Sequence, residues 1–433
     1  MQNRLNKLYH RIRQSLFIKQ VASLGTGTVA AHLITLAFSP VITRLYTAEQ
    51  IGEYSLFHSL VVVLSVIATL TYEYAIVLPK KDSEARNVFL TGFFSTLLFS
   101  TLLFAAGLIF LSGISGWLDV TVIFVLLLPF GVLSNALLSL FTNWFIRRTR
   151  YRDLSLAKIT QSSLMGTTQT GFGFTPYTNA GMLIGYVAGR IAYVLHLSLK
   201  KTRDIRYIFS SVKKSSVLKT AKTYIDQPRY VLLSTLLSVG ALEIPVFIIG
   251  ALFDKELLGF YGLAIRVVSA PVMFIGTSVS HVFFQNLADK KNRGEALTPM
   301  LLKTWGGLAA IGVLPFLILF LYAEPIFSFV FGEDWLMAGT VASILAPLLF
   351  IQFISSPTGK SLMVVEDQRM MPFFSLLQIL ARGLSLLVGA LYFNFMIGLW
   401  LMTASHITAL GIFNLYLYYK LKTFSGSRSG ENE

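Results

Sequence analysis

Apolar runs long enough to cross a membrane recur along the whole chain. A membrane-spanning helix needs about 20 mostly apolar residues. Because lipid cannot hydrogen-bond to backbone groups, such runs must form helices that satisfy their own backbone. The sequence predicts twelve spans, at residues 20–43, 53–78, 88–112, 120–143, 155–177, 180–199, 228–252, 260–284, 301–322, 337–357, 371–392 and 395–418.

The composition supports this prediction. Charged residues make up 13% of the 433 residues, against about 25% in soluble proteins, and the mean hydropathy is +0.66. The chain contains no cysteine, which excludes disulfides and thiolate metal sites. We therefore expect an all-α polytopic membrane protein with no metal site and no cofactor.

Basic residues are distributed unevenly between the two sets of predicted loops. With twelve spans both termini lie on one side, and that side carries all but five of the 36 Lys and Arg residues. Such an excess marks the cytoplasmic side, so both termini are predicted to be cytoplasmic. The net charge of +15 is then a topology signal and implies no nucleic-acid partner. The five exceptions are Arg44 and Lys255 on the opposite side, and Arg190, Arg266 and Arg382 within spans.

The two ends of the chain are predicted to be cytoplasmic segments, residues 1–19 and 420–433. In the first, Leu5, Leu8, Ile12 and Leu16 have helical spacing among basic residues, which is typical of an amphipathic helix on a membrane surface. An anchor to anionic lipid and a simple orientation signal both explain this pattern. No apolar core of a cleavable signal peptide follows it closely.

An internal repeat indicates two lobes of six helices. The motif Glu49–Tyr54 (EQIGEY) resembles Glu256–Tyr261 (ELLGFY), and each follows an apolar span that contains a proline. Further on, Trp117 precedes Pro129 by the same number of residues as Trp335 precedes Pro347. We predict an N-lobe (20–199), a basic linker (200–223) and a C-lobe (224–419). Repeats of six spans share one orientation, which implies a pseudo-twofold axis along the membrane normal and a central cavity.

Polar side chains form stripes on several predicted spans. Thr28 and His32 share a helical face in the first span, while Arg266, Thr277 and His281 lie along the eighth. Small and hydroxyl side chains also serve helix packing, so Ser and Thr alone favour packing over binding. Charge within an apolar span is costly and is usually functional. Arg266 and Glu73 are therefore predicted to face a cavity.

Two other charged residues remain open to alternatives. Glu243 stands two residues before Pro245, where the helix lacks one backbone hydrogen bond. It could bind a proton or cation, or it could pair with Arg266 or another arginine. Arg382, halfway along the eleventh span, is undecided. Three arginines against two glutamates within the spans favour a phosphate-bearing substrate over a cationic one.

Four segments resemble the Wzx-type O-antigen and exopolysaccharide flippases of the multidrug/oligosaccharidyl-lipid/polysaccharide exporter superfamily. They are Tyr72–Lys80 (YEYAIVLPK), Trp144–Arg152 (WFIRRTRYR), Tyr224–Pro228 (YIDQP) and Leu257–Val267 (LLGFYGLAIRV). The similarity covers essentially the whole chain. Thr71 stands where many relatives are expected to have a basic residue, which is a departure beside Glu73.

The resemblance implies translocation of undecaprenyl-diphosphate-linked oligosaccharide, a repeat unit of O-antigen (lipopolysaccharide) or exopolysaccharide, across the bacterial cytoplasmic (inner) membrane. It implies alternating access coupled to an H⁺ or Na⁺ gradient, with polysaccharide polymerase or chain-length machinery as partners beside the membrane lipids. Spans 1, 2, 7 and 8 would line the cavity. On this interpretation Arg266, His32, Arg382, Thr28, Thr277 and His281 contact substrate, and Glu73 and Glu243 are the coupling candidates.

Two alternative functions were weighed against this one. A cation-coupled drug or metabolite antiporter of the same fold is the closer alternative, and the basic excess within the spans counts against it. A membrane enzyme, such as a sugar polymerase or ligase, needs a sizeable domain beside the membrane. The longest outer connection is only residues 322–337, with no carboxylate pair or metal-ligand cluster. We therefore do not expect an enzyme.

Overall fold

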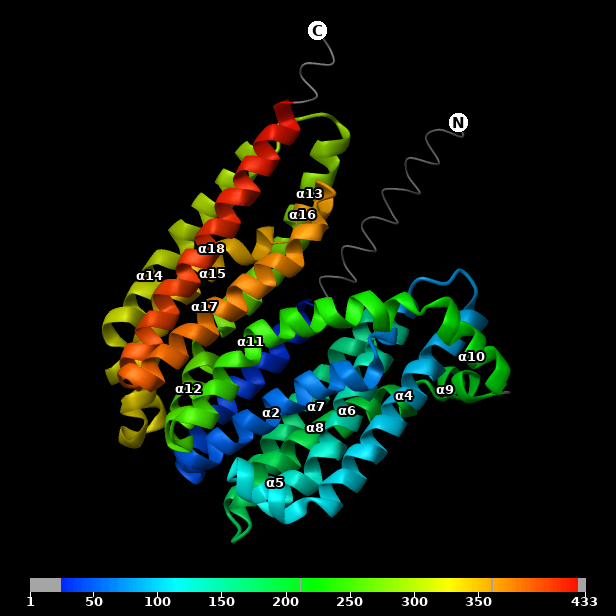
Figure 1. Cartoon of the computed structure of the whole chain (residues 1–433), viewed down its shortest axis with the longest axis horizontal. Helices are drawn as coiled ribbons and strands as arrows, with labels where there is room; N and C mark the ends of the chain where they lie inside the picture. The colour runs from blue at the N-terminus through cyan, green and yellow to red at the C-terminus, as the bar shows by residue number, and fades with distance from the viewer. Residues whose placement is uncertain (1–24, 211, 360, 427–433) are drawn as a thin grey trace. The chain divides into compact units, whose positions relative to one another are not determined.

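The computed structural model describes residues 25–210, 212–359 and 361–426, and these residues are almost entirely helical (Figure 1). The predicted N-terminal amphipathic segment and the last residues of the tail lie outside them. Ten helices in the described part of the chain are long and apolar enough to cross a membrane. The protein is thus an all-α multi-pass membrane protein, as its apolar runs predicted.

The helices separate into two compact units. Unit 1 comprises residues 1–45 and 60–236, and unit 2 comprises 46–59 and 237–433. Two helices, α2 and α11, therefore contribute to both units. The lobes predicted from the repeat, 20–199 and 224–419, remain a proposal.

Unit 1 begins, among the described residues, with a helix at Gly25–Leu45. The helices that follow are α2 (Ala48–Thr69, shared with unit 2), α3 (Tyr72–Ala75), α4 (Asp82–Ile109), α5 (Leu111–Leu118), α6 (Val122–Arg147), α7 (Tyr151–Gly173), α8 (Thr178–Lys200), α9 (Thr202–Phe209), α10 (Lys214–Thr223) and the π-helical turn η1 (Gln227–Val231).

Unit 2 contains most of α11 (Leu232–Leu252) and the remaining helices. These are α12 (Lys255–Val268), α13 (Ala270–Asn292), α14 (Thr298–Phe331), η2 (Glu333–Trp335), α15 (Leu336–Ser355), η3 (Ser356–Thr358), α16 (Ser361–Val364), η4 (Gln368–Met370), α17 (Met371–Tyr392) and α18 (Phe395–Gly426).

Two of the twelve predicted spans coincide with helices that are not among the ten apolar ones. The fifth, predicted at 155–177, is α7, whose many Ser, Thr, Gln and Gly residues make it polar. The eighth, predicted at 260–284, is divided into α12 and α13 by a break at Ser269. Proline lies in the first turn of α13, where its missing N–H is tolerated and where it favours a new helix start.

The predicted linker 200–223 contains two short helices, α9 and α10, which pack into unit 1. Its helices α9 and α10 contribute Ile208 and Val217 to a buried cluster that also contains Phe89, Trp144 and Tyr193. In Figure 1 these two short helices lie at one end of α4. Burial of these side chains holds the basic connection against the helices of unit 1.

The two repeat motifs contact each other within unit 2. A methyl group on Gly52 of α2 would overlap the carbonyl oxygen of Lys255, and one on Gly259 of α12 would overlap that of Ala48. Gly52 and Gly259 occupy the same position in the two motifs, which Ala48 and Lys255 directly precede. Such a reciprocal contact is what a local twofold axis produces. Only glycine allows two helix backbones to approach this closely.

Candidate functional site

A lysine inside α7 lies beside the polar stripe of the first described helix. The two helices cross closely where Gly27 meets Ser155. One turn beyond Ser155, the Lys158 ammonium donates a hydrogen bond of 2.9 Å to Thr28 Oγ1. His32, one turn further along the first helix, is within electrostatic range of the same ammonium. All three side chains are half-buried, and we refer to them as the Lys158 group.

Lys158 falls within the span predicted at 155–177, but it was grouped with the cytoplasmic basic residues and not with the charges inside spans. The helix begins at Tyr151, so Lys158 lies two turns inside it. Basic residues near the start of a span are normally a cytoplasmic topology signal, so Lys158 did not stand out in the sequence. The polar face of α7 was the signal that could have identified it. Among the described residues, the recorded partners of the Lys158 ammonium are neutral groups.

Arg266 is a second half-buried cation with a neutral partner, on α12 of unit 2. Its guanidinium carbon lies 5.0 Å from the centre of the Tyr54 ring, a cation–π contact. The predicted single stripe of the eighth span is interrupted, because the break at Ser269 puts Thr277 and His281 on α13. The side chains of those two residues are outside the described set.

Arg382 on α17 is buried, with 7% of its surface exposed, and its hydrogen bonds are made to protein groups. It donates to the carbonyl of Ala241, and its Nε donates to His406 Nδ1 at 3.1 Å. Near it, Glu243 accepts a hydrogen bond of 2.5 Å from Ser59 and is within electrostatic range of Arg382. We refer to Ser59, Glu243, Arg382 and His406 as the Arg382 group.

The contacts of the Arg382 group address the two points that the sequence left open, the role of Glu243 and the role of Arg382. The cation that acts on Glu243 is Arg382 rather than Arg266. A guanidinium with protein acceptors on two of its nitrogens has less capacity left for a substrate phosphate. The sequence analysis did not single out His406, although an ionisable ring in the apolar run of the last helix could have drawn attention to it.

Glu73 lies beyond the membrane-spanning helix in which it was predicted. The helix α2 ends at Thr69, because Leu70 and Thr71 adopt left-handed backbone angles, with φ of 50° and 58°. Glu73 therefore sits in the short helix α3, with 4% of its surface exposed. Its Oε2 atom has no hydrogen-bond partner among the described residues. Burial raises the pKa of this carboxyl to about 7, against a smaller opposing effect of a hydrogen bond from Thr69.

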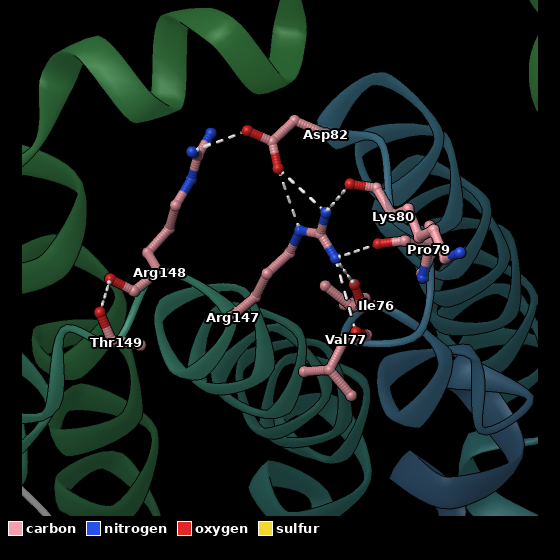
Figure 2. Close-up of polar contacts among 8 residues, drawn as sticks. All are labelled: Ile76, Val77, Pro79, Lys80, Asp82, Arg147, Arg148 and Thr149. Carbon is pink, nitrogen blue, oxygen red and sulfur yellow. Dashed lines mark hydrogen bonds and ion pairs between the residues drawn. The ribbon is translucent and has the colours of Figure 1, made fainter. Parts of the chain in front are cut away.

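The chain that follows Glu73 is held by Arg147 at the end of α6. Figure 2 shows its guanidinium binding the carbonyl oxygens of residues 76, 77, 79 and 80, with the shortest contact, 2.6 Å, to Pro79. Asp82 accepts from both Arg147 and Arg148, at 3.0 and 2.8 Å. A planar cation with five donors can bind a loop backbone in this way where a lysine could not.

Three of the four segments that suggested a family resemblance meet at this place in unit 1. The Arg147 segment binds the Glu73 segment, as described above. The third segment joins them because Thr71 Oγ1 donates to the carbonyl of Gln227 at 3.0 Å and Tyr224 donates to Glu84 at 3.1 Å. These motifs therefore build a structural junction around Glu73 and do not form a substrate pocket by themselves.

The fold is that of an all-α multi-pass membrane protein that carries polar and charged groups among its helices. The structure superimposes on the lipid II flippase MurJ in an inward closed conformation with a TM-score of 0.70 and 15% identity, covering 92% of this chain and 87% of that one. An inward-facing MATE family multidrug resistance transporter of the MOP superfamily gives a TM-score of 0.63 and 12% identity, covering 93% and 95%. At these identities the likeness establishes the fold alone.

Residues 41–340 match the family model described as polysaccharide biosynthesis protein. The chain belongs to this family, which confirms the resemblance seen in its motifs. It is also 27% identical, over 202 residues, to the teichuronic acid biosynthesis protein TuaB of Bacillus subtilis (strain 168). That alignment covers 43% of this chain and about two-fifths (41%) of the relative's length.

Proposed function

We propose that this protein is a flippase that moves an undecaprenyl-diphosphate-linked oligosaccharide across the bacterial cytoplasmic membrane by alternating access. One observation supports it most: among the described residues, the half-buried cations Lys158 and Arg266 are held by neutral partners and not by carboxylates. Cations placed in this way keep their charge available for an anionic ligand. Membership of a polysaccharide biosynthesis family supports a polysaccharide precursor as that ligand.

The roles of the two cations follow from their chemistry. The Arg266 guanidinium, backed by the Tyr54 ring, presents a fork of donors that matches phosphate oxygens. The Lys158 ammonium is a compact charge whose contact with Thr28 can be exchanged for a phosphate oxygen. Thr28 and His32 would assist as neutral donors or acceptors. The sugar could belong to O-antigen, exopolysaccharide or another cell-surface polymer.

Coupling is proposed to involve protonation of Glu73. This carboxyl is buried, and one of its oxygens has no hydrogen-bond partner in the described part of the chain. A pKa of about 7 would let it gain and lose a proton near neutral pH. Glu243, which accepts a hydrogen bond from Ser59 and lies within electrostatic range of Arg382, is the weaker candidate. The predicted orientation, with both termini cytoplasmic, and association with a polymerase or chain-length protein belong to the same proposal.

The cation-coupled drug antiporter is disfavoured by the same geometry. A cationic drug would need a carboxylate near its path, yet Lys158 and Arg266 would repel it. The described partners of Lys158 and Arg266 are neutral, so neither cation site would attract a positively charged substrate.

The test is deletion of the gene followed by analysis of the lipid-linked intermediates. We expect surface polysaccharide to be lost and a repeat unit on undecaprenyl diphosphate to accumulate in the inner leaflet. Complementation by Arg266→Ala should fail at normal protein abundance, whereas Arg293→Ala, an exposed arginine of the same unit, should restore export. Normal polysaccharide in the deletion strain would refute the flippase, and full export by Arg266→Ala would refute the role of Arg266.

A further inference from the structure

Within unit 2, a groove of about 480 Å³ runs between α13 and α14. One wall has residues at the spacing of a single helical face, Val279, Val282, Phe283 and Asn286 on α13. The other wall is a matching stripe on α14, formed by Met300, Lys303 and Thr304. The groove is open on its outer side, since Val282 is 61% exposed.

The groove is polar at one end and apolar at the other. Its polar end lies toward the connection between the two helices, because Asn286 is the last lining residue of α13 and Lys303 lies in the second turn of α14. The last turn of α13 carries Lys290 and Lys291, and Arg293 follows in the connection, which marks this end as a membrane surface. Away from it the α13 wall is made of Val279, Val282 and Phe283.

The surface of α14 continues smoothly beyond the groove. The next turn of this helix contains Gly306 and Gly307, and a Cβ atom on either would meet no described protein atom within 4 Å. A hydrocarbon chain could follow this bare backbone toward the middle of the membrane. The groove therefore has the outline of an amphiphile, with a polar head at the surface and a tail directed inward.

The charge of the groove lining indicates which kind of amphiphile the groove can bind. Its lining contains one cation, Lys303, and two neutral polar groups, Asn286 and Thr304. One ammonium matches the single negative charge of a phosphodiester, and its long side chain can reach the headgroup level. A prenyl diphosphate carries more charge and would need further cations, which the lining does not supply.

We propose that the α13–α14 groove is a binding site for an anionic phospholipid of the bilayer. The phosphodiester contacts Lys303 and Asn286, and one acyl chain lies along Val282 and Val279. This site is separate from the Lys158 and Arg266 cations and does not depend on the proposed function.

The proposal can be tested by native mass spectrometry of the purified full-length protein. It would be titrated with phosphatidylglycerol and with phosphatidylcholine of identical acyl chains. We expect the anionic lipid to bind about fivefold more tightly, the effect of roughly one basic residue near a membrane surface. Lys303→Gln should remove this preference, whereas Lys303→Arg and the exposed control Lys422→Gln should retain it.

A second pair of variants tests the tail. Val282→Trp should fill the groove and lower the occupancy of both lipids, while Leu314→Trp, on an exposed part of α14 outside the groove, should not. Circular dichroism and gel filtration of each variant would verify its fold. Equal binding of the two lipids, or an unchanged preference in Lys303→Gln, would overturn the proposal. So would a polyprenyl phosphate that binds more tightly than phosphatidylglycerol and is excluded by Val282→Trp.

Discussion

The Lys158 group of unit 1 and the Arg382 group of unit 2 both place a cation among membrane-spanning helices, but they treat its charge differently. Lys158 is half-buried and donates to a hydroxyl. Arg382 is buried, donates to a carbonyl and a histidine, and lies within range of the Glu243 carboxylate. The first cation is half-buried with a hydroxyl partner, whereas the second is buried and its donors are occupied by protein acceptors.

The difference teaches that charge within a span is not by itself a sign of substrate contact. A buried ion pair gains little net stability, but removing one partner leaves an uncompensated charge and is strongly destabilising. A cation with neutral partners can instead be replaced without leaving such a charge behind. The two groups should therefore respond to substitution in opposite ways, one in stability and the other in transport.

The largest effect is expected for Arg382→Met. This change leaves Glu243 without its compensating cation and the Ala241 carbonyl without its donor. Stability should fall by about 3–5 kcal/mol, seen as low abundance in the membrane and a lowered Tm. The double variant Arg382→Met/Glu243→Gln should recover part of the loss. Normal abundance and Tm in the single variant would show that the Arg382 group is not a structural ion pair.

A smaller, purely functional effect is expected for Lys158→Gln. Loss of one charge-assisted hydrogen bond to a phosphate, about 1.5–3 kcal/mol, should reduce export roughly ten- to hundredfold without changing Tm. Export would be measured as labelled polysaccharide appearing at the cell surface. Lys222→Gln, at an exposed position of the same unit, is the matched control. If Lys158→Gln lost stability and not export, the contrast between the two groups would fail.

The smallest effect should distinguish the two glutamates. Glu73 is protonated below pH 7 and charged above it, so Glu73→Gln imitates the protonated form at every pH. We expect a few-fold change of wild-type export across pH 7, measured in proteoliposomes, that disappears in Glu73→Gln. Glu243→Gln keeps the Ser59 contact and should retain the pH dependence. The opposite pattern would place proton coupling on α11.

Much of the fold could be predicted from the sequence because lipid imposes a simple length and polarity rule on each helix. The rule fails where the chain leaves a helix for local reasons. Leu70 and Thr71 end α2 in left-handed conformations that neither residue favours, and the contacts of Arg147 and Gln227 that accompany this break are distant in sequence. Glu73 was consequently assigned to a span that ends before it.

The residues of the candidate sites could be predicted from their type and position, but which residues contact one another could not. Arg266, Arg382 and Glu243 stood out as charges in apolar runs, whereas the choice of Arg382 as the partner of Glu243 depends on how α11 packs against α17. Lys158 was hidden because positive charge near the start of a span has an ordinary explanation in topology. Pairing between helices is tertiary information, and no local pattern in this chain contained it.

The reciprocal contact of Gly52 and Gly259 has a consequence for the history of the chain. A contact that is self-complementary about a twofold axis is also the contact that a half-length protein would make with a second copy of itself. The crossing of α2 and α12 therefore has the form of a homodimer interface, the form that duplication and fusion of a half-length chain would leave. Each glycine is then constrained by the other, and a side chain gained by either would strike the backbone of its own duplicate.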